Sequence, residues 1–350
     1  MQTKIWRMPA HKPDEELLEE AASFLKKGEL VAFPTETVYG LGGNALDSSA
    51  SRKIYEAKGR PSDNPLIVHI SDINQIDELV RSIPPVAIKL MEKFWPGPIT
   101  FVLPKSDKIP AVITGGLDTV AIRMPAHKIA LKLIEIAGLP IAAPSANISG
   151  RPSPTTAQHV IDDLGGKIAG IIDGGKAGVG VESTVLDLTT PVPTILRPGG
   201  VTLEDLQKEI GEVHIDKGLI DANHVPRSPG MKYTHYSPEA DVIIVKGSLT
   251  EMAEKILTIT GEELGQGKKV GLMVSQELYE LLKTDLPGSV LVEILGKKNN
   301  LAQVTSNLFM ELRALDKEKV DVIYVENFPE TYIGAALMNR LYKAAGGKTI

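Results

Sequence analysis

Lys58-Gly59-Arg60-Pro61 and Ala143-Pro144-Ser145-Ala146-Asn147 are the two stretches that say most about this chain. Each is predicted to form a loop beside a regular element. The first supplies a pair of cations, and the second supplies a small hydroxyl and an amide. Lysine offers a point charge and arginine a planar fork for phosphate oxygens. Together the two stretches predict a site for a polyphosphate.

Lys58 and Arg60 also allow a simpler interpretation. They follow a helix predicted over Ser51–Lys58, and cations at a helix C-terminus are favoured by the helix dipole. However, Pro61 and Pro65 stiffen the loop and fix the direction of the cations. This arrangement favours the phosphate role.

No glycine-rich stretch of the chain is a complete P-loop. Gly170–Lys176 has the right glycines and lysine, but Ala177 follows where Ser or Thr would bind magnesium. Gly346–Thr349 ends like a P-loop, but Tyr342 stands in place of the first glycine. Gly40–Ala45 mimics a dinucleotide fingerprint without a clean strand before it. We interpret all three as turns, so any nucleotide is bound by a less common route.

The composition places the chain among globular proteins of two domains. It has 350 residues, 43% hydrophobic and 23% charged. The absence of cysteine excludes disulfides, thiolate nucleophiles and Cys-ligated zinc. A net charge of −6 and 5% aromatic residues argue against nucleic acid as the main partner. With no apolar span and no signal peptide at the N-terminus, we expect a cytoplasmic location.

The pattern of predicted elements changes near residue 210. Before it, strands and helices follow one another irregularly, which is typical of a mixed α/β sheet. Residues 211–238 are rich in Gly, Pro, His and Asp and predict a linker. After it, helical segments alternate strictly with strand-like runs at Val242–Val245, Val270–Val274, Val290–Ile294 and Val320–Val325. We therefore expect a mixed α/β domain at 1–210, a linker at 211–238 and a small Rossmann-like parallel domain at 239–350.

Other polar residues allow structural and functional interpretations. Arg123 and Arg197 each end a strand before a proline-containing turn; a strand-end charge can simply be solvated, but the repeated context favours binding. His69 within a strand is most simply a core histidine bonded to backbone. Ser145 and Ser183 have no His and Asp partners at local spacing, so nothing favours a hydrolase triad. Histidine spacing predicts no metal site built by protein ligands alone.

The motifs, taken in order, resemble one family: the threonylcarbamoyl-AMP synthases, which carry a YrdC-like domain. The matching segments are Pro34–Leu41, Lys58–Pro61, Asn64–Leu66, Trp95–Pro98, Val120–Pro125, Ala143–Asn147, Glu182–Thr184 and the linker segment Pro229–Tyr236. The resemblance spans residues 15 to 238, and the Rossmann-like C-terminal domain marks the long form. It implies a twisted mixed sheet with helices, followed by the smaller parallel domain.

This resemblance implies that the chain joins L-threonine, bicarbonate and ATP into threonylcarbamoyl-AMP and pyrophosphate. The adenylate would then feed modification of the tRNA adenosine next to the anticodon, through downstream transfer enzymes. Mg²⁺ would arrive with ATP. Direct tRNA binding is left open, and no membrane partner is expected.

The resemblance also implies roles for individual residues. ATP would be bound by Lys58, Arg60, Asn64, Thr119, Ser145, Asn147, Ser153, Arg197 and Tyr236, with Lys58 and Arg60 as the catalytic pair. Threonine would be bound by Thr35, His69, Arg123, the Ala143 backbone and Ser183. Tyr236 would close over the nucleotide, which makes the linker a lid that excludes water.

Three rival hypotheses stay open on the sequence alone. The first is a non-catalytic RNA-binding module, which the acidic net charge disfavours. The second is a carbamoyl-adenylate-forming enzyme of the same fold, whose relatives carry zinc fingers that a chain without cysteine lacks. The third gives the C-terminal domain a nucleotide site of its own, but only Lys246-Gly247-Ser248 follows its first strand.

Overall fold

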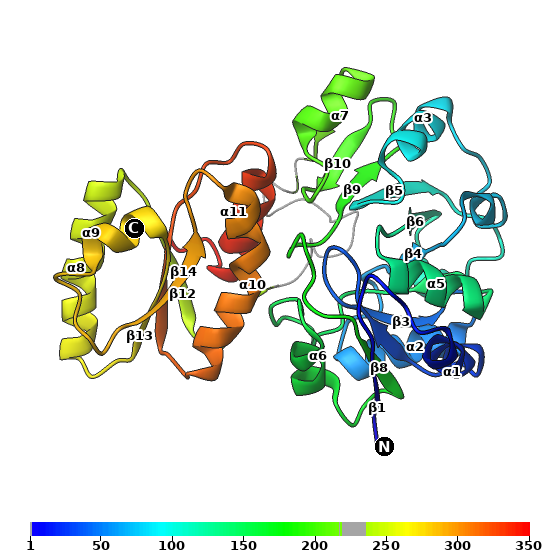
Figure 1. Ribbon diagram of the computed structural model, residues 1–350. Coiled ribbons are helices and arrows are strands. Elements are labelled where there is room, and N and C mark those ends of the chain that lie inside the picture. Colours follow the sequence, from blue (N-terminus) through cyan, green and yellow to red (C-terminus); the bar gives the residue numbers. More distant parts are fainter. Residues whose placement is uncertain (1, 217, 219–235) are drawn as a thin grey trace. The chain divides into compact units, whose positions relative to one another are not determined.

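The computed structural model describes residues 2–216, 218 and 236–350, which fall into two compact units (Figure 1). Of the described residues, the first unit takes those up to Ser149 and those from Ser153 to Gly218. The second takes Gly150–Pro152 and Tyr236–Ile350. The domain limits expected at 210 and 238 stay a prediction, because most of the linker between them lies outside the described residues.

The first unit is built on a mixed sheet whose strands follow the order β1-β8-β2-β3-β7-β4-β6-β5-β9-β10-β11. The strands are β1 (Lys4–Arg7), β2 (Val31–Phe33), β3 (Gly40–Asn44), β4 (Ile67–His69), β5 (Ile99–Pro104), β6 (Thr119–Arg123), β7 (Ile141–Ala142), β8 (Gly170–Asp173), β9 (Thr184–Asp187), β10 (Thr194–Arg197) and β11 (His214–Ile215). Parallel pairs such as β4–β6 occur beside antiparallel pairs such as β5–β6. The predicted mixed α/β sheet is confirmed.

Helix α2 positions the first of the two loops that dominate the sequence, because Lys58 is its last residue. Asp47 caps its N-terminus by accepting the amide of Ser49 at 2.7 Å. Gly59 ends it with a φ of 60°, a left-handed conformation that glycine adopts at little steric cost. The helices of this unit are α1 (Glu15–Lys26), α2 (Ser48–Lys58), the 3-10 helix η1 (Ile73–Glu78), α3 (Pro85–Phe94), α4 (Ala111–Thr114), α5 (Lys128–Ala137), α6 (Ala157–Leu164) and α7 (Leu203–Ile210).

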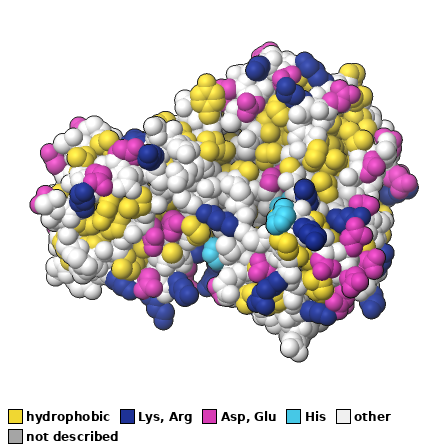
Figure 2. All heavy atoms as spheres, viewed as in Figure 1, with side chains coloured by type: hydrophobic (Ala, Val, Ile, Leu, Met, Phe, Trp, Pro, Cys, Tyr) yellow, Lys and Arg dark blue, Asp and Glu magenta, His cyan; other side chains and the backbone are white. Residues whose placement is uncertain are grey.

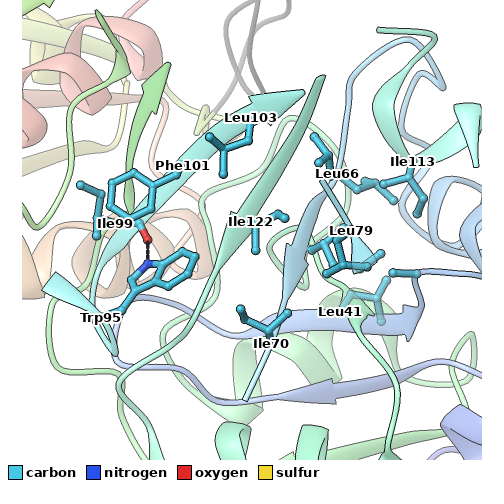
Figure 3. Close-up of a cluster of buried hydrophobic side chains, with 14 of the residues drawn as sticks. Leu41, Leu66, Ile70, Leu79, Trp95, Ile99, Phe101, Leu103, Ile113 and Ile122 are labelled. Carbon is cyan, nitrogen blue, oxygen red and sulfur yellow. Dashed lines mark hydrogen bonds between the residues drawn. The ribbon is translucent and has the colours of Figure 1, made fainter. Parts of the chain in front are cut away.

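A large hydrophobic cluster fixes the central strands against the helices (Figure 3). Leu41, Ile70, Phe101 and Ile122 are fully buried in it and come from four different strands or strand ends. The indole nitrogen of Trp95 donates to the carbonyl of Ile99 at 3.0 Å, so the end of α3 is tied to the start of β5. The short connection between these two elements is thereby held in place.

The turn expected at Gly40–Ala45 is wrong, because this stretch is largely strand β3. Gly170–Lys176 begins with strand β8 and leaves the strand after Asp173. A Cβ atom on Gly42 would lie 2.8 Å from the Phe33 ring, and one on Gly170 would lie 2.1 Å from the Trp6 ring. These glycines therefore serve close packing of a strand against a neighbouring side chain, not a change of direction.

The second unit is a smaller parallel α/β domain, as the alternating pattern predicts. Its strands, in the order β12-β15-β13-β14, all pair in parallel. Figure 1 shows α8 and α9 on one face of this sheet and α10 and α11 on the other. The elements are β12 (Asp241–Val245), α8 (Leu249–Gly265), β13 (Val270–Ser275), α9 (Gln276–Leu282), β14 (Leu291–Gly296), α10 (Leu301–Lys317), β15 (Val322–Glu326) and α11 (Ile333–Ala344).

The second unit is discontinuous in sequence. The guanidinium of Arg313 on α10 donates to the carbonyl of Pro152 at 3.1 Å from Nε and 2.6 Å from Nη2. The amide of Ser237 donates to the carbonyl of Gly150 at 2.9 Å. Three residues from the first half of the chain thus complete a domain made from its end.

Two further observations concern membrane-spanning helices and the charges on the surface. No helix among the described residues combines the length and the apolar character needed to cross a bilayer. On the face shown in Figure 2, acidic and basic side chains are interspersed. This mixture fits the modest net charge of −6.

Two helical glycines give a matched test of packing in the second unit. A methyl group on Gly261 in α8 meets no atom within 4 Å, so Gly261→Ala should stabilise the unit by about 0.5–1 kcal/mol. A methyl group on Gly334 in α11 would lie 2.0 Å from the carbonyl oxygen of Pro329, so Gly334→Ala should destabilise it. Native-state hydrogen exchange on β12–β15 measures both effects, and equal protection in the two variants would contradict the prediction.

Candidate functional site

The ammonium of Lys58 joins the two stretches that dominate the sequence. It donates to the carbonyl of Ser145 at 2.6 Å and to the carbonyl of Asn147 at 2.5 Å, with the Asn147 amide oxygen at 3.4 Å. Lys58 is only 2% exposed. A buried ammonium is tolerated because these oxygens replace water. The structure therefore brings Lys58, Ser145 and Asn147 together, as expected.

Arg60 and Asn64, both expected to bind ATP, lie directly after α2. Arg60 donates from Nε to the carbonyl of Asn64 at 3.3 Å and from Nη2 to the carbonyl of Pro65 at 3.1 Å. Tyr55 donates to the same Asn64 carbonyl at 3.2 Å, and burial raises the pKa of Tyr55 to about 12. These contacts hold the loop in one conformation beside the Lys58 group.

Arg123, at the end of β6, is 4% exposed and surrounded by oxygen atoms. Its Nη1 donates to the hydroxyl of Thr37 at 2.9 Å, and its Nε to the carbonyl of Gly97 at 3.4 Å. Its Nη2 lies 2.7 Å from a carboxylate oxygen of Glu36. The Thr35 hydroxyl lies 2.8 Å from that of Thr37, so Thr35 reaches Arg123 through one intermediate. A buried guanidinium in this position suits a carboxylate ligand.

His69 is the neighbour of Arg123 across the parallel β4–β6 pair. Its Nδ1 lies 3.2 Å from the carbonyl of Ile67, so the core-histidine interpretation describes its backbone contact correctly. Burial, reinforced by the charge of Arg123, lowers the pKa of His69 to about 3. The ring is therefore neutral near pH 7 and offers hydrogen bonds without a charge.

Ser183 and Arg197 are in direct contact, although the resemblance assigns them to different ligands. Arg197 donates from Nε to the Ser183 carbonyl at 3.0 Å and from Nη2 to its hydroxyl at 3.1 Å. The Ser183 hydroxyl also lies 2.8 Å from that of Thr100. The two predicted residues are therefore brought together by the structure.

The other predicted residues lie in different surroundings. Ser153 is fully buried and its hydroxyl donates to the carboxylate of Glu182. Thr119 lies at the opposite end of β6 from Arg123. Tyr236 belongs to the second unit, where its ring stacks on Phe309 at 5.3 Å between centroids, with the Arg340 guanidinium 5.5 Å from its centre. Apart from Tyr236, the predicted linker segment 229–236 lies outside the described residues.

One short piece of chain connects the two groups of residues. Ile141 pairs with His69 across β4 and β7, and the chain then runs through Ala143 to Ser145, whose carbonyl accepts from Lys58. The Ala143 amide is fixed by the carbonyl of Ile67 at 2.9 Å. Four residue steps reach about 14 Å at most. Ligands bound at the two groups would therefore lie side by side.

Several residues of the site carry no assigned role in the sequence interpretation: Glu36, Thr37, Gly97 and Glu182. All four lie inside motifs that the sequence singles out. Their polar groups contact Arg123 or Ser153 directly. The motif pattern was the available signal, but residue type alone does not show which member of a motif faces inward.

Acidification should destabilise the first unit through His69. The unfolded chain takes up a proton near pH 6.5, while the folded ring resists it until about pH 3. The free energy of unfolding should thus fall with decreasing pH in this window, by about 1.4 kcal/mol per pH unit from this group. In His69→Gln and His69→Asn this contribution disappears, whatever their stability at pH 7.

Trp6 and Trp95, the two tryptophans of the chain, both lie in the first unit, so their fluorescence reports its unfolding. Urea titrations at pH 4, 5, 6 and 7 give the slope of the free energy of unfolding against pH for the wild type and for each variant. A variant with the wild-type slope would show that His69 is not protected from protonation.

Two family models match the chain in succession. The first, described as "Telomere recombination", matches residues 23–199, and the second, described as "Threonylcarbamoyl-AMP synthase, C-terminal domain", matches residues 201–346. The threonylcarbamoyl-AMP synthase of Bacillus subtilis is 50% identical over 354 aligned positions, covering 100% of both chains. That of Pyrococcus abyssi is 51% identical over 331 positions, covering 94% of each.

A solved structure agrees with these matches. The crystal structure of Pyrococcus abyssi Sua5 complexed with L-threonine superimposes with a TM-score of 0.93 at 49% identity, covering 100% of this chain and 99% of that one. Fold, motifs and full-length similarity therefore agree, and the chain belongs to the threonylcarbamoyl-AMP synthase family, in its two-domain form.

Proposed function

We propose that the chain condenses L-threonine, bicarbonate and ATP into threonylcarbamoyl-AMP and pyrophosphate. The observation that carries this proposal is the pairing of two cationic groups in one unit: Lys58 with its loop oxygens, and Arg123 buried one strand from His69. One group suits phosphates and the other a carboxylate. Because family members are enzymes, the alternative of a non-catalytic RNA-binding module is set aside.

On the ATP side, the proposed contacts are Lys58, Arg60, Asn64, Thr119, Ser145, Asn147, Ser153, Arg197 and Tyr236. Lys58 and Arg60 neutralise phosphate charge, and ATP enters as its Mg²⁺ complex. Among the described side chains there is no group of three His, Asp or Glu residues fit to hold a metal ion. In this proposal the phosphates supply most of the ligands that Mg²⁺ needs.

On the threonine side, the proposed contacts are Thr35, His69, Arg123, the Ala143 backbone and Ser183. Arg123 binds the carboxylate, since a guanidinium offers two parallel N–H groups to two oxygens. His69 stays neutral, because burial holds its pKa at about 3. A neutral ring can hydrogen-bond a hydroxyl without repelling the substrate ammonium.

The reaction needs positioning and charge neutralisation more than a covalent nucleophile. The threonine amine and bicarbonate form a carbamate: a C–N bond forms, a C–O bond of bicarbonate breaks and water leaves. The carbamate oxygen then attacks the α-phosphorus. A carbamate O–P bond forms, the bond between the α-phosphorus and the bridging oxygen breaks, and pyrophosphate leaves. Fixed cations stabilise the negative charge that develops. The product is a labile mixed anhydride, so downstream enzymes that transfer the threonylcarbamoyl group to tRNA would consume it.

Removing the Arg60 charge tests the phosphate role. Arg60→Ala should lower pyrophosphate release by about 10²-fold with threonine and bicarbonate present, since one fixed donor to the developing charge is lost. Arg52→Ala is the matched control, because Arg52 is an exposed arginine on α2, the helix that ends just before Arg60. Unchanged release by Arg60→Ala would show that Arg60 does not act on the phosphates.

Product identity tests the function as a whole. Mass spectrometry after incubation with ATP, bicarbonate and a panel of amino acids should detect threonylcarbamoyl-AMP with threonine and only when bicarbonate is present. Formation of carbamoyl-AMP from carbamoyl phosphate instead would favour the carbamoyl-adenylate alternative.

A further inference from the structure

Glu36 is a buried carboxylate with little to bind. It lies in the connection between β2 and β3, and its side chain is 15% exposed. Both carboxylate oxygens are shielded from solvent. The carboxylate forms an ion pair with Arg123, at 2.7 Å from Nη2, and within the described residues neither oxygen accepts a hydrogen bond of good geometry.

Shielding a carboxylate from water without hydrogen-bond donors costs free energy. An ionised carboxylate has about four acceptor positions, and burying them without donors forfeits the hydrogen bonds that water would provide. Buried polar groups in native proteins are nearly always satisfied, and an exception calls for a physical reason. A reason consistent with the position beside Arg123 is a ligand that brings donors.

The backbone around Glu36 is fixed. Its carbonyl accepts the amide of Val179 at 2.8 Å, and the carbonyl of Thr37 accepts that of Gly180 at 3.1 Å. The hydroxyl of Thr35 accepts the amides of Thr37 and Val38, at 3.2 and 3.3 Å. The carboxylate is thus presented by a stiff segment, which favours a binding role over an incidental one.

A second buried polar atom lies close to this carboxylate. The Nδ1 atom of His127 is shielded from solvent, and within the described part of the chain it has no hydrogen-bond partner. Burial lowers the pKa of His127, while the negative charge of Glu36 acts in the opposite direction. Two buried polar groups that interact electrostatically and lack hydrogen-bond partners within the described part of the chain favour a polar ligand over a single ion.

We propose that Glu36 binds the ammonium group of L-threonine while Arg123 binds its carboxylate. This proposal rests on the function proposed above and adds a specificity residue to it. The Arg123–Glu36 pair is neutral overall and carries one charge of each sign, as an amino-acid zwitterion does. Placed side by side in opposite directions, the two dipolar units satisfy each other without burying a net charge.

Two simpler roles for Glu36 make different predictions. If it only holds Arg123 in position, its loss weakens every carboxylate ligand. If it only occupies Arg123 until substrate arrives, its loss strengthens every carboxylate ligand. Only an ammonium-binding role makes the effect of losing Glu36 on affinity depend on whether the ligand has an amino group.

The test compares two ligands that differ at one group. Isothermal titration calorimetry of the full-length protein is carried out with L-threonine and with the 2,3-dihydroxybutanoate of the same configuration, which has a hydroxyl in place of the ammonium. In Glu36→Gln, threonine should bind about tenfold or more weakly, as expected for the loss of one charge-assisted contact. The hydroxy analogue should bind within about twofold of the wild type.

A parallel loss or a parallel gain for both ligands would overturn the proposal in favour of one of the two simpler roles. Glu29→Gln is the matched control, since Glu29 is a partly exposed carboxylate paired with Lys53. If Glu36→Gln does not fold, as judged by tryptophan fluorescence, Glu36→Asp takes its place. It keeps the charge but shortens the reach, so it should lose affinity for threonine and not for the analogue.

The two proposals fail in distinguishable ways. If the wild-type protein binds no threonine and forms no threonylcarbamoyl-AMP, the proposed function is wrong. If the wild type does both and Glu36→Gln binds threonine as tightly as the wild type, only the role of Glu36 is wrong.

Discussion

The site depends above all on the Lys58 ammonium and the carbonyls of Ser145 and Asn147. A buried cation must find oxygen atoms, and these are supplied by a loop almost 90 residues away in sequence. The amide of Ser149 donates back to the carbonyl of Lys58 at 2.8 Å. The end of α2 and the 145–149 loop are therefore one rigid piece, and neither can shift without exposing an uncompensated charge or carbonyl.

The buried charged and titratable groups of the first unit share a common arrangement. Arg123 faces Glu36, Arg197 lies against the carbonyl and hydroxyl of Ser183, and His69 is kept neutral by burial. Each buried cation is thus compensated before any substrate arrives. A substrate with charges of both signs fits such a surface better than a simple anion does. Each of its charges can replace a protein partner of the same sign, so no net charge is left buried.

The sequence predicts much of this arrangement because its signals are local. The loop prolines after α2 and the strict β–α alternation after residue 240 each indicate their structure within a few residues. Two pairs of residues expected at the ATP site are in contact: Lys58 with Asn147, and Arg60 with Asn64. The predictions that fail concern residues whose structure depends on neighbours far away in the sequence. Gly42 looks like a turn residue, and only the Phe33 ring beside it shows why glycine is needed.

The same limit applies to the site. Glu36 and Thr37 lie in a motif that stands out in the sequence, but their partner Arg123 is more than 80 residues away on β6. Pairing between β4 and β6 brings His69 beside Arg123, and no spacing rule along the chain encodes that register. Functional residues of this kind become visible only when the sheet order is known.

Because the second unit is built from two separate stretches of sequence, truncating the gene affects contacts in both. Arg313 and Ser237 bind the carbonyls of Pro152 and Gly150, and those carbonyls are encoded between Asn147 and Ser153. A gene shortened before codon 236 would still encode the two carbonyls but not the groups that bind them, so water or other donors would have to replace those groups. The C-terminal unit therefore includes three residues that the first half of the chain supplies. Insertions or deletions near codon 150 should evolve together with changes in α10.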